Sequence, residues 1–151
     1  MKTICLLGCR SLILLFFALI FNSCSLSSDD PPIPAPSATG FTWRENDPNG
    51  PLKTAGSSEL RTQYKSIFAF SGATVSSGTL FEFNLTGVSP ATYPVNASNA
   101  FYFNGNTATP ASGEVVITSN ANGKASGTFK ATWSSGAITS VYGTFTDIHV
   151  N

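Results

Sequence analysis

The chain has few of the residue types that metal sites and most enzymes use. Its three cysteines lie within the first 24 residues, His149 is its one histidine, and 11% of its residues are charged. Residues 41–151 therefore cannot form a disulfide among themselves. Zinc needs three or four converging His, Cys or carboxylate ligands, so we expect no metal and no cofactor.

The chain also lacks an excess of positive or negative charge. Residues 41–151 carry six basic and six acidic side chains, and no stretch is rich in Lys or Arg. Binding to nucleic acid depends on clustered cations that neutralise phosphates. We therefore expect no nucleic-acid partner.

No apolar run is long enough to cross a membrane. The longest, residues 12–21, has ten residues, about half of what a spanning helix needs. It follows Lys2 and Arg10 and precedes small residues, a pattern typical of a processed export signal. Ordinary cleavage after Ser25 and a retained membrane helix are the alternatives.

The end of this segment, Phe21-Asn22-Ser23-Cys24, resembles the lipobox of bacterial lipoproteins. The resemblance implies that residues 1–23 are a signal peptide and that Cys24 is the lipid attachment site, with a diacylglycerol thioether on its sulfur. Several acyl chains make such an anchor to the membrane stable. Because Ser25 rather than Asp follows, the resemblance favours the outer membrane.

Residues 24–40 contain four prolines, Asp29 and Asp30, and few apolar side chains. Such a segment cannot form a core and favours an extended chain, so we expect a disordered tether. Acidic residues soon after the cysteine resemble the export signal of Bacteroidota-type surface lipoproteins, which implies exposure on the cell surface. Alternatively the tether is simply polar, and the protein faces the periplasm.

Residues 41–151 suit one domain, and their pattern is that of strands. In residues 123–133 small and aromatic side chains alternate with Lys, Ser and Thr, which predicts a strand with one buried face. Residues 141–145 continue this alternation, but Ile148 has the opposite parity, so we expect a bulge near Asp147. We predict an all-β domain, an antiparallel sandwich or small barrel of about eight to ten strands.

Turn signals separate these strands. Asn104-Gly105 predicts a type I′ hairpin turn between residues 101–103 and 106–108. Residues 57–64 read as a loop or a single helical turn. Turn residues at 120–123 and 134–136 predict that the last three strands form an antiparallel meander.

The second half of the domain is similar to small uncharacterised lipoprotein domains of Bacteroidota type. The similarity rests on the order Thr92-Tyr93-Pro94, Ala100-Phe101-Tyr102, residues 113–118, residues 126–129 and Gly143-Thr144-Phe145. It implies a β-sandwich at the cell surface and identifies no functional residues.

Candidates for chemistry are few. His149 lacks an identifiable nucleophile and carboxylate partner, and Glu82 and Glu114 read as exposed strand residues rather than a glycosidase pair. We expect no catalytic residues. Calcium is the one ion left open, since Asp47, Asn49 and Glu45 could supply oxygen ligands. The sequence Asp-Pro-Asn-Gly is, however, already explained as a turn.

Aromatic residues are the better candidates for binding. Trp43 and Trp133 share the parity of neighbouring phenylalanines, which predicts that they are buried. Tyr102 and Tyr142 have the opposite parity to their apolar neighbours, so each is expected to present its ring and hydroxyl to solvent as a ligand contact.

The sequence thus favours a surface-anchored lipoprotein with a non-catalytic binding module for a glycan or a protein. A structural subunit that pairs through a sheet edge is the alternative. A hydrolase is a third reading, disfavoured because the carboxylates are scattered and there is one histidine.

Overall fold

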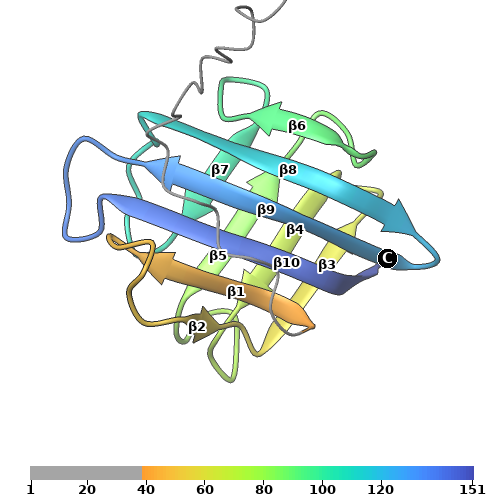
Figure 1. The fold of residues 1–151 in the computed structure, drawn as a ribbon, viewed down its shortest axis with the longest axis horizontal. Coiled ribbons are helices and arrows are strands. Elements are labelled where there is room, and N and C mark those ends of the chain that lie inside the picture. The colour runs from red at the N-terminus through yellow and green to blue at the C-terminus, as the bar shows by residue number, and fades with distance from the viewer. Residues whose placement is uncertain (1–38) are drawn as a thin grey trace, which may run out of the picture. The chain divides into compact units, whose positions relative to one another are not determined.

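The structure is a computed structural model that describes residues 39–151 (Figure 1). Cys24, the signal peptide and nearly all of the tether lie outside these residues. The strands are β1 (Gly40–Glu45), β2 (Lys53–Thr54), β3 (Ser57–Arg61), β4 (Ser66–Phe70), β5 (Leu80–Asn84), β6 (Ala91–Pro94), β7 (Ala100–Phe103), β8 (Ser112–Ala121), β9 (Lys124–Thr132) and β10 (Ser140–Val150). The described part of the chain contains no helix, which confirms the all-β class.

The strands form one curled sheet in the order β6-β8-β9-β10-β3-β4-β5-β7. β1 pairs with the first half of β10, and β2 pairs with β1. Figure 1 shows β8, β9, β10 and β1 lying in front of β3, β4 and β5, so the sheet folds over on itself into two facing layers. The predicted meander of β8, β9 and β10 is confirmed.

A bulge in β10 joins the two layers. Asp147 has a φ of 53°, and the register with β9 shifts between Phe145 and Ile148, as the sequence pattern predicted. A bulge bends its strand and increases the local twist. Before the bulge, β10 lies against β1; after it, His149 and Val150 pair with β3 in parallel, the one parallel pairing among the described strands.

The core between the layers is largely aromatic. The Phe129 ring stacks on Phe41 with centroids 4.7 Å apart and lies 5.0 Å from Phe83. Room for it depends on Gly143, the residue opposite on β10, where a Cβ would lie 2.1 Å from the Phe129 ring. Trp43 and Trp133 are buried, as their parity predicted.

Two local predictions were wrong. A tight turn does lie at Asn104-Gly105, where Asn106 N donates to Phe103 O. The type I′ geometry and the second strand were wrong, because neither Asn104 nor Gly105 has a positive φ and no strand follows at 106–108. Instead the Asn104 side chain bonds the β4–β5 loop, accepting from Leu80 N and donating to Gly78 O. A type I′ turn needs positive φ at both central residues, and the structure meets this at Asn122 and Gly123 between β8 and β9, with φ of 54° and 72°.

The second error is the segment 57–64. Residues 57–61 form strand β3 rather than a loop or helical turn, because β3 pairs with β4 over its whole length and with the end of β10. The turn that does occur spans residues 62–65, where Lys65 N donates to Thr62 O.

Candidate functional site

A pocket of about 230 Å³ lies beside the outer edge of β7. Its walls come from β7, from the turn that precedes it and from the loop that follows it. The lining residues are Val95, Asn96, Ala100, Phe101, Tyr102, Thr107, Ala108, Thr109 and Pro110. None of these side chains is charged, and burying an unpaired charge is costly, so the pocket suits an uncharged ligand.

Both walls are held by hydrogen bonds within the protein. On one side Asn96 Oδ1 accepts from the backbone N–H groups of Ser98 and Asn99, at 2.8 and 3.0 Å. On the other side the buried Trp133 donates from Nε1 to the carbonyl of Ala108 at 2.8 Å. A pocket whose walls are already ordered costs a ligand less entropy to enter.

The backbone of β7 supplies polar groups at this pocket. Asn104 N donates to Leu80 O on β5. Because N–H and C=O groups alternate between the two sides of an antiparallel strand, those of Phe101 face away from β5. No other strand of the described chain pairs with β7 there. Phe101 therefore offers one donor and one acceptor at the edge where the pocket lies.

The structure places the two candidate tyrosines apart. Tyr102 lines the pocket with 40% of its surface exposed, whereas the preceding residue, Phe101, is buried. Tyr142 lies in the other layer, on β10, where its register partners are Arg44 and Lys130. It is half-buried and does not line the pocket. The two tyrosines therefore do not belong to one site.

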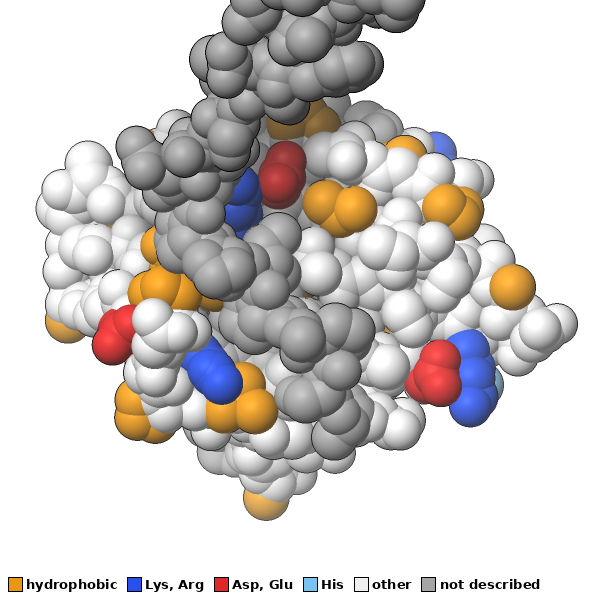
Figure 2. All heavy atoms as spheres, viewed as in Figure 1, with side chains coloured by type: hydrophobic (Ala, Val, Ile, Leu, Met, Phe, Trp, Pro, Cys, Tyr) orange, Lys and Arg blue, Asp and Glu red, His pale blue; other side chains and the backbone are white. Residues whose placement is uncertain are grey.

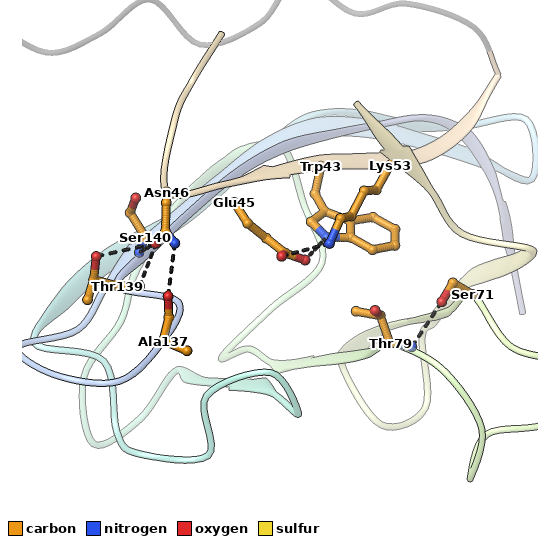
Figure 3. Close-up of polar contacts among 9 residues, drawn as sticks. All are labelled: Trp43, Glu45, Asn46, Lys53, Ser71, Thr79, Ala137, Thr139 and Ser140. Atoms are coloured by element: carbon orange, nitrogen blue, oxygen red, sulfur yellow. Dashed lines mark hydrogen bonds and ion pairs between the residues drawn. The ribbon is translucent and has the colours of Figure 1, made fainter. Parts of the chain in front are cut away.

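Hydrogen bonds within the protein occupy the carboxylates of Glu45 and Asp47; those of Glu45 are drawn in Figure 3. Glu45 accepts from Trp43 Nε1 at 2.9 Å and from Lys53 Nζ at 2.7 Å. Asp47 Oδ1 accepts from Asn49 N at 2.8 Å, as in an Asx turn. Both carboxylates thus have partners, and no three His, Cys, Asp or Glu side chains converge within residues 39–151.

Asn46 is a residue whose role the sequence did not indicate. It has a φ of 62°, which Asn tolerates better than most residues. Its Oδ1 accepts from Thr139 N at 2.7 Å, and its Nδ2 donates to Ala137 O at 2.9 Å, so it fastens the β9–β10 loop to the end of β1 (Figure 3).

The possible acid and base residues are not brought together. Glu82 on β5 and Glu114 on β8 point outward from opposite layers, with the core between them. Glu114 is paired with Lys130 at 3.6 Å. His149 is exposed on β10, opposite Glu59 and Lys124 in register. Figure 2, which views the layer of β8, β9, β10 and β1, shows few charged side chains where grey atoms do not cover that face.

Sequence reasoning also missed an apolar surface on β4. Ile67 and Ala69 are buried in the core, yet Phe68 and Phe70, of opposite parity, are half-buried on the outer face. Their rings meet edge to face with centroids 5.9 Å apart. The signal was present as an uninterrupted apolar run at 67–70, since a strand with one wet face normally alternates.

Comparisons of the chain with family models, with curated proteins and with solved structures give no match. No helix within residues 39–151 has the length and apolar character that crossing a bilayer requires.

Proposed function

We propose that the protein is a surface-anchored lipoprotein of the outer membrane whose domain is a non-catalytic binding module for a neutral glycan. The observation that supports this best is the pocket at the β7 edge, which combines an exposed tyrosine ring, free backbone groups and an uncharged lining. Its volume is below the roughly 300–1,000 Å³ of drug-sized sites, which favours a ligand that inserts one small group, such as a single sugar ring of a longer chain.

The outward, opposite-facing positions of Glu82 and Glu114 argue against the hydrolase reading. Glycosidases hold two carboxyl groups about 5–10 Å apart across the scissile bond. Two carboxylates on the outer faces of two layers that enclose an aromatic core do not approach in that way.

The test starts with the processed, lipidated protein in a neutral polyoxyethylene detergent on an array of bacterial and host glycans. A glycan that binds is then titrated against three variants. Tyr102→Ala should weaken binding at least tenfold because it removes the exposed ring, whereas Tyr102→Phe should retain most of the affinity. Tyr142→Ala is the matched control, since this tyrosine lies on the other layer, and it should bind like the unaltered protein.

The alternative, a subunit that assembles through a sheet edge, has its own structural support. β6 and β7 each pair with a single neighbour among the described strands, so each leaves one edge open. β6 contains Pro94, which has no N–H group and therefore needs no hydrogen-bond acceptor from a further strand. Specific glycan binding by a monomer supports the module. No glycan binding together with concentration-dependent oligomers in sedimentation would support the assembly role instead.

A further inference from the structure

A row of side chains on the outer face of the back layer carries a second set of polar and aromatic groups. The register pairs Phe68 on β4 with Glu82 on β5, and Glu82 with Tyr102 on β7. Directly opposite residues have Cβ atoms about 4.5–5.5 Å apart. Glu82 is therefore flanked on both sides by an aromatic residue.

The row extends by one more residue on β3, where Glu59 is opposite Phe68. It thus alternates carboxylate, ring, carboxylate, ring across four strands. Neither Phe68 nor Phe70 packs against the core cluster. An apolar surface outside the core, rimmed by polar groups, is typical of an interaction site.

One half of this row already binds a cation from the chain itself. The guanidinium of Arg61 lies 4.4 Å from the centre of the Phe68 ring, and its Nε donates to the Glu59 carboxylate. A guanidinium prefers such a combination, because it stacks on an aromatic face while it donates to a carboxylate.

The other half offers the same two groups without a cation. Glu45, Glu59, Glu114 and Asp147 each form an ion pair with Lys or Arg within residues 39–151, but Glu82 forms none. Its one described contact is with Asn84 Nδ2 at 3.3 Å. Glu82 as a residue is half-buried, while Tyr102 beside it is 40% exposed.

From this repetition we infer that Glu82 and Tyr102 bind an arginine side chain of a protein partner, in the manner in which Glu59 and Phe68 hold Arg61. The partner docks on the outer face of β4, β5 and β7, with Phe70 and Phe68 as the apolar part of the surface. This site shares Tyr102 with the proposed glycan pocket, but Phe68 and Glu82 do not line that pocket.

The experiment uses the processed, lipidated protein in neutral detergent and two short peptides. One contains a single arginine, and the other contains citrulline, which has nearly the same shape and no charge. Backbone amide shifts in NMR report binding and its position. The arginine peptide should shift the amides of Phe68, Glu82 and Tyr102 and bind at least tenfold more tightly than the citrulline peptide.

Glu82→Gln removes the charge with little change in size and should reduce arginine binding to the citrulline level. Glu114→Gln, on the outer face of the other layer, is the matched control and should change nothing. Tyr102→Leu is a second variant that should weaken binding with Glu82 intact. Melting temperatures of all variants identify any that fail to fold.

Equal binding of the two peptides, shifts confined to other residues, or full binding by Glu82→Gln would overturn the inference. Shifts of Phe68 and Glu82 caused by a neutral glycan instead would assign the surface to sugars. The two proposals fail separately, because Glu82→Gln should leave glycan binding at the pocket unchanged.

Discussion

Phe129→Ala tests the assignment of the buried face of the sheet, on which every placement above depends. The Phe129 ring is 1% exposed and has four other rings within 4.7–6.1 Å. Replacing a fully buried Phe by Ala costs about 3–5 kcal/mol. Aromatic pairs add about 0.5–1.5 kcal/mol beyond burial, so we expect the upper half of that range. A domain of this size has a free energy of unfolding of about 5–15 kcal/mol.

Urea unfolding followed by tryptophan fluorescence measures this loss, since Trp43 and Trp133 are both buried. With a slope of about 2 kcal/mol per molar urea, the midpoint should fall by about 2 M. Lys130→Ala, the next residue on β9, is the control. It should cost no more than about 1 kcal/mol, because its ion pair with Glu114 is partly exposed to solvent. Equal shifts for the two variants would refute the assignment of the faces.

Three further predictions follow from the chain and its fold. Cys24→Ala should abolish fatty-acid labelling and release the protein from the membrane fraction or leave it as precursor; unchanged labelling would contradict the lipobox interpretation. Excess calcium and a chelator should leave the melting temperature unchanged, because the Asp47 and Glu45 carboxylates already have partners; a rise of several degrees with calcium would instead indicate a bound ion. Gly143→Ala should lower the free energy of unfolding by about 1–3 kcal/mol through overpacking against Phe129, and an unchanged urea midpoint would show that the ring does not occupy that space.

Strands with one buried and one solvent-exposed face were predictable, because apolar and polar residues alternate along them and so indicate which side is buried. The pattern at 124–132 predicted β9, and the change of parity before Ile148 predicted the bulge at Asp147. β3 was not predictable in the same way. Its residues, Ser-Ser-Glu-Leu-Arg, have one buried side chain, Leu60, and they form a strand because β4 and β10 lie on either side.

The sequence predicted the exposure of single residues at the candidate sites, but it did not predict which other groups surround them. The parity of Tyr102 correctly indicated exposure. The pocket beside it depends on the loop at 107–110, which the bond from Trp133 positions from 25 residues away. The row of Phe68, Glu82 and Tyr102 depends on the register of three strands, and the β5–β7 pairing skips β6 in the chain order.

The parallel pairing at the end of β10 has a consequence for how the chain acquires its fold. One group of paired strands consists of β3, β4, β5 and β7, and a second group consists of β6, β8, β9 and β10. The two groups are joined where residues 149 and 150 of β10 pair with β3. β1 likewise finds its long partner in residues 141–146. A chain that emerges from the ribosome or a translocation pore in order therefore exposes Phe41 and Trp43 until almost all of the domain has followed. Because such distant contacts form slowly, the domain closes its core only when its last strand has become available, which is the behaviour that the export proposed above would require.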